Sequence, residues 1–187
     1  MRFAVTRTCL AGVPLVLAVL AASSSLAQSP RIHEPEQPQP WAVYFSPGGG
    51  ATQAVVDTLG LAKETVLVQA PSLTSTTIVK ALVAARQRGV KVEVILDRKQ
   101  AGSRSSVANT MTSARIRTLI DGAHAIADNR AMVIDTQVIL TGSFNFTTAA
   151  EHQNAESLLV VHDAMLAARY TENWQLHAAH SVTYNGR

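Results

Sequence analysis

The chain has 187 residues, of which 16 are Lys or Arg, 13 are Asp or Glu and one is cysteine. A single cysteine excludes a fold held together by disulfides, and no basic run of the kind found in dedicated nucleic-acid-binding proteins is present. The length is sufficient for one compact domain that is stabilised by its own core.

The first 27 residues are predicted to be a secretory signal peptide. Arg2 and Arg7 give a positive start, residues 9–22 are apolar, and residues 25–27 (Ser-Leu-Ala) form a small-x-small cleavage site. The apolar run is shorter than the roughly 20 residues of a membrane-spanning helix. We therefore expect cleavage near Ala27 and a periplasmic or secreted protein, with an uncleaved anchor as the alternative. Cleavage would leave 14 basic against 13 acidic side chains, because two of the 16 arginines and lysines lie in the signal.

Residues 28–40 are predicted to be a proline-rich linker. The segment carries four prolines among glutamine and glutamate residues and has almost no apolar side chain. Such a composition cannot bury enough apolar surface to form a core. The folded domain is therefore expected to comprise residues 41–187.

This domain is predicted to alternate strands and helices. Strands are expected at residues 41–45, 65–70, 90–96, 130–135, 137–141 and 157–161, and helices at residues 51–62, 76–88, 106–113 and 164–179. The short helix at 106–113 lies in a looser segment, residues 100–121. Alternation of this kind implies crossover connections, with helices packed on a sheet. The predicted fold class is α/β, with a mixed β-sheet flanked by helices.

The strongest functional signal is one motif in the second half of the chain. Asp-Asn-Arg at residues 128–130 is followed by four residues and Asp135, and then by six residues and Gly-Ser-Phe-Asn at residues 142–145. This spacing resembles the motif of the phospholipase D superfamily: His-x-Lys, four residues, Asp, six residues and Gly-Ser-x-Asn. Every interval is kept, but Asp128 stands at the histidine position and Arg130 at the lysine position.

The resemblance extends over roughly residues 41–178 and is greatest to the small, single-motif, secreted bacterial endonucleases of that superfamily. Residues 146–151 and 154–161 are similar to the segments that follow the motif. The resemblance implies a phospholipase D-like domain acting on phosphodiester bonds.

The resemblance implies the mechanism of the superfamily. In that mechanism the histidine attacks phosphorus and forms a phosphohistidine, while lysine and asparagine stabilise charge on the non-bridging oxygens. No metal or other cofactor is required. A chain with one motif acts as a homodimer, in which the partner's histidine protonates the leaving group. The phosphodiester ligand is expected to be a nucleic acid rather than a phospholipid.

The same resemblance assigns roles to six residues of this chain. Ser143 and Asn145 would donate to the developing oxyanion, Glu156 would orient the nucleophile, and Asp135 would be a structural carboxylate. Residues 128 and 130 are expected to project to the same side, because positions two apart on a strand share a face. The candidate catalytic residues are Asp128, Arg130, Asp135, Ser143, Asn145 and Glu156.

Aspartate at position 128 changes the expected chemistry. A carboxylate is a weak nucleophile and cannot act as a general acid near neutral pH. It also repels the negative charge of a phosphodiester, with an energy on the order of 4 kcal/mol at a distance of about 4 Å. A repulsion of that size in the transition state slows the reaction by roughly three powers of ten. Arg130 can reduce this repulsion by pairing with Asp128, but that pairing would occupy the cation that binds phosphate. Arginine in place of lysine could itself bind phosphate through two oxygens.

Three functions are compatible with the sequence. The first is an exported phospholipase D-like domain whose turnover is lost or weak and which retains phosphate, nucleic-acid or partner binding. The second is an active phosphodiesterase in which Asp128 attacks directly, or in which His124 replaces the missing histidine. The third is a structural subunit of a secretion apparatus.

Residues other than the motif add little to this interpretation. His124 is expected on a preceding strand, about 13 Å from residue 128 at roughly 3.3 Å per residue, which is too far for a direct replacement. His177 and His180 are expected at the end of the last helix, where a cation suits the helix dipole. A metal site built from Asp128, Asp135 and Glu156 is conceivable, but no clustered histidine or cysteine supports it.

Overall fold

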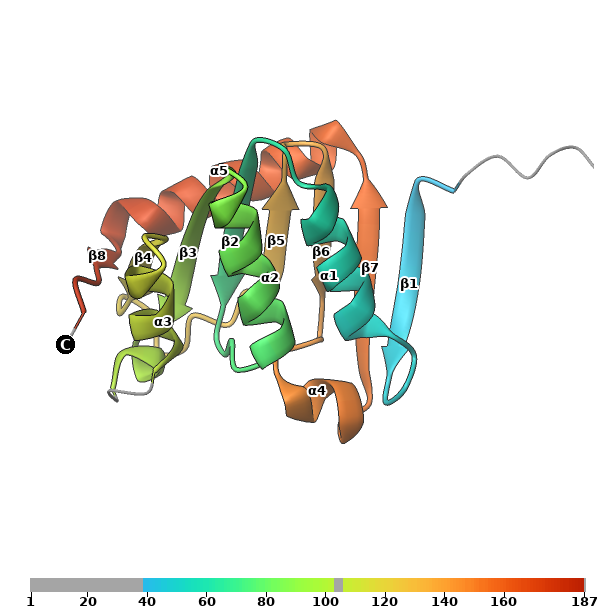
Figure 1. Ribbon diagram of the computed structural model, residues 1–187, viewed down its shortest axis with the longest axis horizontal. Coiled ribbons are helices and arrows are strands. Elements are labelled where there is room, and N and C mark those ends of the chain that lie inside the picture. The colour runs from blue at the N-terminus through green and yellow to red at the C-terminus, as the bar shows by residue number, and fades with distance from the viewer. Residues whose placement is uncertain (1–38, 103–105, 187) are drawn as a thin grey trace, which may run out of the picture. The chain divides into compact units, whose positions relative to one another are not determined.

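A single mixed sheet of eight strands lies at the centre of the computed structural model, which describes residues 39–102 and 106–186 (Figure 1). The strands are β1 (Trp41–Ser46), β2 (Thr65–Ala70), β3 (Lys91–Asp97), β4 (Arg117–Asp121), β5 (Ala131–Ile134), β6 (Val138–Gly142), β7 (Glu156–His162) and β8 (Val182–Thr183). Their order is β1-β7-β6-β5-β2-β3-β4-β8. Only the β2–β3 and β3–β4 pairs are parallel. The predicted signal peptide and all but the end of the predicted linker lie outside the described residues.

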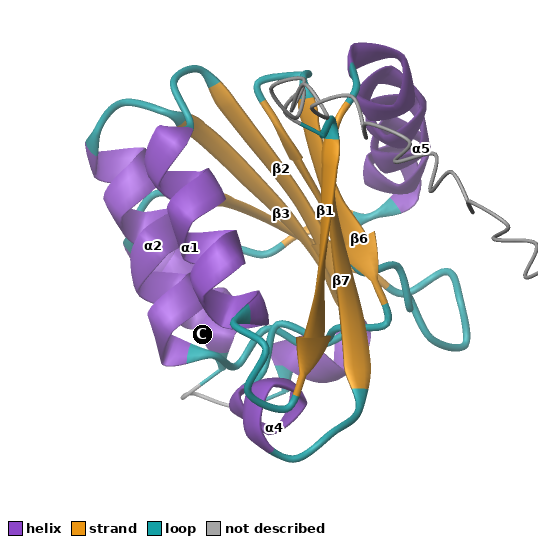
Figure 2. Ribbon diagram, turned by 90° about the vertical axis from the view of Figure 1, so that its right-hand side faces the viewer, coloured by secondary structure: helices purple, strands orange, loops and turns teal. Residues whose placement is uncertain are grey.

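Helices cover both faces of the sheet. They are α1 (Ala51–Leu61), α2 (Thr76–Gln87), the 3-10 turn η1 (Arg98–Ala101), α3 (Val107–Ser113), α4 (Thr148–His152) and α5 (Ala164–His180). Figure 2 shows α1 and α2 against one face and α5 against the other. The predicted fold class, an α/β domain with a mixed sheet flanked by helices, is confirmed.

The alternation of side chains along the strands produces these two layers. In β2, Val66 and Val68 belong to the large core beneath α1 and α2, whereas Leu67 contacts the smaller clusters beneath α5. Trp174 anchors α5, because its ring is buried and its indole N–H donates to the Val68 carbonyl over 2.9 Å. Strand β3 is buried almost throughout, as expected for a strand covered on both faces.

The elements predicted from the sequence are present, with ends that differ by one residue at most. The prediction missed η1, β4, α4 and β8. The five residues of β4 are bounded by Arg117 and Asp121, so the apolar pattern is short. Helix α4 has only five residues and begins at a local cap, where the Thr147 side chain accepts from the Ala150 N–H.

A buried carboxylate joins α4 to α1. Gly50, the residue before α1, has a left-handed conformation and no side chain to cap the helix. Glu151 of α4 supplies that cap, because its Oε2 accepts from the Thr52 N–H over 2.7 Å. The negative charge also suits the N-terminal end of the helix. This contact fixes α4 at the edge of the sheet where β1 ends and β7 begins (Figure 1).

Candidate functional site

Strand register brings most of the motif to one edge of the sheet. Ala131 at the start of β5 lies opposite Thr141 near the end of β6, and Gly142 lies opposite Leu158 near the start of β7. The parallel strands β2, β3 and β4 also end at this edge, since β5 is antiparallel to β2. Open α/β sheets bind ligands outside the carboxyl ends of their parallel strands. We call this end of the sheet, where β2, β3 and β4 finish and β5 and β7 begin, the site edge.

Arg130 links two residues of the motif at the site edge. Its Nη2 lies 2.9 Å from Asp128 Oδ1, and its Nε donates to Asn145 Oδ1 over 2.9 Å. The pairing of Asp128 with Arg130 predicted from the sequence is therefore present. The strand prediction at this point was too long, because β5 begins at Ala131 and both charged residues lie in the preceding loop. The Asp128 side chain is 53% exposed and that of Arg130 24%.

The Gly-Ser turn packs closely against the start of β7. Gly142 has φ 148°, and a Cβ added to it would lie 2.2 Å from the Ser157 carbonyl oxygen. The Ser143 hydroxyl accepts from the Ser157 N–H over 3.0 Å. Beyond the turn, the Phe146 carbonyl accepts from the N–H groups of Thr74 and Ser75, each over 3.0 Å. Asn145 is thus held between β6 and the loop that follows β2.

Glu156 lies on the same edge but is not joined to Asp128. Its Oε1 accepts from Asn154 Nδ2 over 3.0 Å, and its backbone N–H donates to the Ser46 hydroxyl over 3.2 Å. Glu156 and Ser143 both line an open hollow of about 400 Å³. Among the described residues, Glu156 forms no hydrogen bond or ion pair with Asp128 or Arg130. The contact that its predicted role in orienting the nucleophile needs is therefore absent.

Asp135 lies at the opposite edge, beyond the end of β5. Its carboxylate accepts from the N–H groups of Lys63, Glu64 and Thr65 over 2.9, 2.8 and 2.9 Å. Partial burial raises the pKa of Asp135. These hydrogen bonds and the Lys63 charge together lower the pKa by more than burial raises it, so the net shift is downward. The three residues Asp128, Asp135 and Glu156 therefore cannot share one metal ion in this structure, because Asp135 is separated from Asp128 by the length of β5.

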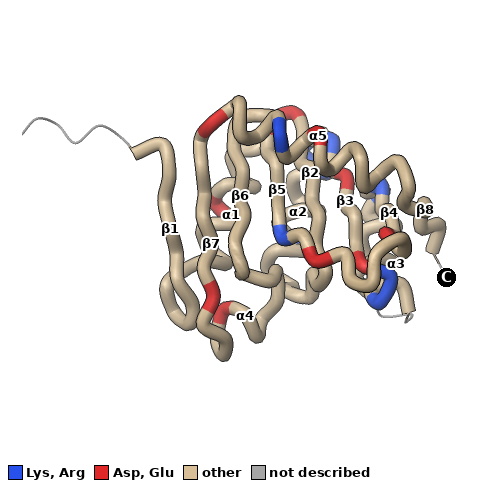
Figure 3. Tube along the Cα trace, turned by 180° about the vertical axis from the view of Figure 1, so that it is seen from behind, with Lys and Arg blue, Asp and Glu red and all other residues tan. Residues whose placement is uncertain are grey.

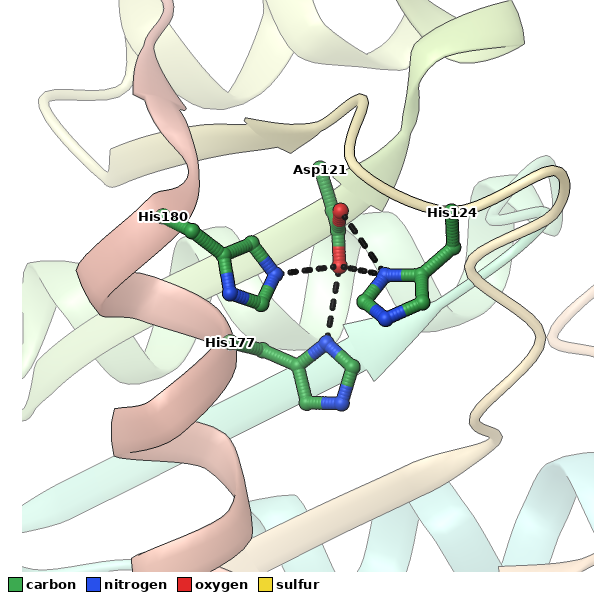
Figure 4. Close-up of side chains that lie close together, drawn as sticks. All are labelled: Asp121, His124, His177 and His180. Atoms are coloured by element: carbon green, nitrogen blue, oxygen red, sulfur yellow. Dashed lines mark hydrogen bonds and ion pairs between the residues drawn. The ribbon is translucent and has the colours of Figure 1, made fainter.

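Sequence reasoning missed a histidine cluster at the site edge. His124, His177 and His180 surround the buried carboxylate of Asp121, the last residue of β4 (Figure 4). Ring nitrogens of the three lie 3.2, 2.8 and 3.2 Å from Asp121 Oδ2. His124 was expected on a strand and as a possible substitute nucleophile, but it lies in the loop after β4 and faces Asp121.

The sequence contained part of the signal for this cluster. The spacing of His177 and His180 places both on one face of α5. The predicted position at the helix end is correct, but their partner is Asp121 as well as the helix dipole. Asp121 gave no signal, because β4 was not predicted. Burial raises the pKa of Asp121, whereas hydrogen bonds from His177, His180, the Ala123 N–H and His124 lower it more, to well below its usual range.

Charges of both signs alternate along the site edge. Figure 3 shows acidic positions beside basic ones along the chain near the start of β5 and the ends of β3 and β4. Of the basic groups here, Arg130 contacts Asp128, and Arg98 donates to the Ala125 carbonyl over 3.2 Å. Within residues 39–102 and 106–186, this edge therefore offers an anionic ligand only a few cationic groups.

The comparisons with known proteins agree with this architecture. A family model described as the PLD-like domain of cardiolipin synthase matches residues 55–177. The chain belongs to the phospholipase D superfamily. This confirms the family resemblance that the motif spacing predicts. The superfamily domain is also found in the solved structure of Nuc from Salmonella typhimurium, a phospholipase D family member, with 33% identity and a TM-score of 0.75. That match covers 78% of this chain and 98% of Nuc.

Two further relatives define the extent of the phospholipase D similarity. A protein named phospholipase D from Rickettsia bellii is 38% identical over 130 residues, which is 70% of this chain and 65% of that protein. The matched region thus spans slightly less than two thirds of this curated relative. NucT from Helicobacter pylori shares the fold, with a TM-score of 0.72 at 18% identity over 77% of this chain and 98% of NucT. Among the described residues, no helix is long and apolar enough to cross a membrane.

Proposed function

We propose that this chain is an exported phospholipase D-type phosphodiesterase domain with a degenerate active site. In this proposal turnover is lost or greatly weakened, whereas binding of phosphate groups or nucleic acid is retained. The observation that carries the proposal is the 2.9 Å contact between Asp128 Oδ1 and Arg130 Nη2. A carboxylate stands where the superfamily has its nucleophilic imidazole, and it pairs with the cation that should receive the phosphate.

Loss of the imidazole removes two functions that the reaction needs. Formation of the covalent intermediate needs both a nucleophile that attacks phosphorus and an acid that protonates the leaving oxygen as it departs. An ionised carboxylate at Asp128 attacks poorly and carries no proton to donate. Because a single-motif protein takes both groups from equivalent positions in two copies, one substitution removes the nucleophile and the acid together.

Retention of phosphate binding is supported by the donors that Arg130 has left. A guanidinium has five N–H donors, and the two contacts to Asp128 and Asn145 occupy only one Nη2 donor and Nε. Among the described residues, nothing accepts from Asn145 Nδ2. The free donors of Arg130 and Asn145 thus lie side by side at the site edge, where they can bind two oxygens of one phosphate.

The decisive experiment restores the motif. We expect the double variant Asp128→His/Arg130→Lys to hydrolyse a bis-aryl phosphate diester or plasmid DNA at least about a hundredfold faster than the unmodified protein. Each single variant separates the contribution of the nucleophile from that of the cation. Asp57→His/Arg169→Lys, which places the same changes at exposed positions, is the matched control and should leave the rate unchanged.

A second candidate is an active phosphodiesterase with Asp128 as nucleophile. It is favoured by the 53% exposure of the Asp128 side chain and by Oδ2, which has no partner among the described residues. Attack by this oxygen on phosphorus would form an acyl phosphate and expel the alkoxide, and water would then hydrolyse the acyl phosphate. Robust turnover by the unmodified protein that disappears in Asp128→Ala would establish this candidate and reject the degenerate site.

Nucleic acid is the proposed ligand in preference to phospholipid, on the basis of the similarity to small single-motif endonucleases. Binding of a fluorescent DNA oligonucleotide that weakens steeply with salt would support this choice, because phosphate contacts release counterions. Binding to phosphatidylglycerol vesicles that exceeds binding to DNA would reverse it.

Export and dimerisation complete the proposal. Residues 1–27 have the charge, apolar run and cleavage pattern of a signal peptide. N-terminal sequencing of the protein from the periplasm or medium should therefore begin near Gln28. A symmetric homodimer is proposed from the single motif, and a solution mass that shows only monomer at micromolar concentration would reject it.

A further inference from the structure

We propose that Asp121, His124, His177 and His180 form a binding site for one divalent transition-metal ion of the zinc class. The site is separate from the proposed phosphate site and has a structural role. Each of the four residues offers one ligand atom, and these atoms all lie within 4.8 Å of one another. Within the described part of the chain, this is the one group of three or more His, Cys, Asp or Glu residues with such spacing.

The geometry of the cluster matches a tetrahedral ion. Ligands that bind at about 2.0–2.1 Å in a tetrahedral site lie about 3.4 Å from one another. The three nitrogen–oxygen distances to Asp121 Oδ2, 3.2, 2.8 and 3.2 Å, are already close to that value. The ring centroids form a nearly equilateral triangle with sides of 5.0, 5.3 and 5.2 Å (Figure 4). Small rotations of the rings would therefore bring all four ligand atoms onto one ion.

Hydrogen bonding alone does not account well for this convergence. A carboxylate oxygen has about two lone-pair sites, yet three imidazole nitrogens approach Asp121 Oδ2. The same residue has its Oδ1 engaged by the Ala123 N–H over 3.0 Å. A cation between the three rings and Oδ2 gives every one of these atoms a partner, and the fully buried Asp121 carboxylate supplies a negative charge that the cation neutralises.

The ligand set selects the metal. Imidazole suits zinc, copper, nickel and iron, whereas magnesium and calcium prefer oxygen-only sites. Three imidazoles and one carboxylate provide the four ligands of a closed zinc site, which leaves no open position for a reacting water. The expected role is therefore structural.

An ion at this point would connect three segments that are distant in the sequence. Asp121 ends β4, His124 lies in the loop that follows, and the two other histidines belong to the last turn of α5. The loop continues directly to Asp128 and Arg130. His177 also approaches the intervening Asn129, with Nε2 3.4 Å from Nδ2. Rotation of the Asn129 amide would let its oxygen accept from a metal-bound His177, which is the usual outer partner of a ligating histidine.

The test is zinc binding to the purified protein after treatment with a chelator. Titration with Zn²⁺, followed by calorimetry and elemental analysis, should give one ion per chain. Zinc at a hundred times its Kd should raise Tm by roughly 5–10 °C. Replacement of zinc by Co²⁺ should give the intense visible absorption of a tetrahedral site with nitrogen and oxygen ligands.

Variants locate the ion. His177→Ala/His180→Ala should weaken zinc binding by at least about a hundredfold, because loss of even an outer partner costs ten- to a hundredfold. His124→Ala, in an exposed loop position that places little demand on folding, should also weaken it. His152→Ala and His162→Ala remove exposed histidines outside the cluster and should bind as the unmodified protein does. Unmodified protein that does not bind zinc one to one, or an unchanged Kd in the double variant, would overturn the proposal.

Discussion

Asp128 and Arg130 form an ion pair across one intervening residue, with Oδ1 2.9 Å from Nη2. Both groups are partly exposed, so the pair stabilises the fold by less than about 1 kcal/mol. Its larger effect is on ligands, because the carboxylate repels the anion that the guanidinium attracts. In the proposed degenerate site, the pair would therefore lower the affinity for phosphate at the point where the superfamily motif binds it.

Removal of Asp128 should therefore strengthen anion binding. We expect Asp128→Asn to bind a short DNA oligonucleotide about tenfold more tightly, since a repulsion of about 1–2 kcal/mol is lifted after solvent screening. Fluorescence polarisation at low and moderate salt measures the change. Asp57→Asn, at an exposed position on α1, is the control. Equal affinities for Asp128→Asn and the unmodified protein would show that no phosphate binds beside Arg130.

Asp135 should make the fold sensitive to acid. Its pKa is lowered in the folded state, mainly by the N–H groups of Thr65, Glu64 and Lys63 acting against burial. Its ionised form therefore stabilises the fold above the unfolded pKa of about 4, and this stability is lost as pH falls through the lower folded value. Asp135→Ala should reduce the free energy of unfolding by about 1–2 kcal/mol at pH 7.

Urea denaturation at several pH values checks this prediction. The difference in unfolding free energy between Asp135→Ala and the unmodified protein should shrink below about pH 4. A difference that stays constant from pH 7 to pH 3 would contradict the ionised, hydrogen-bonded state of this carboxylate.

Gly142 should not tolerate a side chain. With φ 148° and the Ser157 carbonyl 2.2 Å from an added Cβ, Gly142→Ala must displace either β7 or the Ser143 turn. We expect a loss of more than about 2 kcal/mol in stability. Gly60→Ala is the matched comparison, because Gly60 lies in α1 with open space around its Cβ position. That change should stabilise the protein by about 0.5–1 kcal/mol, and thermal unfolding of the two variants should move in opposite directions.

Zinc removal should loosen the loop of residues 122–130. If the ion holds His124 against the end of α5, a chelator should increase amide hydrogen exchange in this loop and in the last turn of the helix. Exchange in β2 and β3 serves as the internal reference and should change little. Uniform exchange with and without chelator would contradict a structural role for the metal.

Much of this fold could be predicted because its elements carry their own local patterns. Helices such as α1 and α2 show apolar residues at helical spacing, and the motif spacing predicts that Asp128, Arg130 and Asn145 lie in one site, where the structure joins them through Arg130. The alternation of charged and apolar residues predicted β3, although the structure buries Glu93 together with its apolar neighbours. Short elements with polar ends, such as β4, do not contain enough residues to reveal a period.

The sites themselves depended on contacts that no local pattern encodes. Glu156 keeps its predicted place on the site edge, but its partner is Asn154 rather than a nucleophile. His177 and Asp121 are separated by 56 residues, and they meet only because α5 crosses the face of the sheet to the end of β4. A pair of this kind cannot be predicted until the order of the strands is known.

The position of His177 and His180 in the last helix also sets a time order for maturation. During synthesis the segment containing Asp121 emerges well before α5, so this buried carboxylate meets His177 and His180 only after the helix has been made. The proposed zinc site would therefore stay incomplete on the nascent chain until α5 had been made. Loading of that site with zinc would accordingly follow the synthesis of α5 rather than accompany the folding of β4.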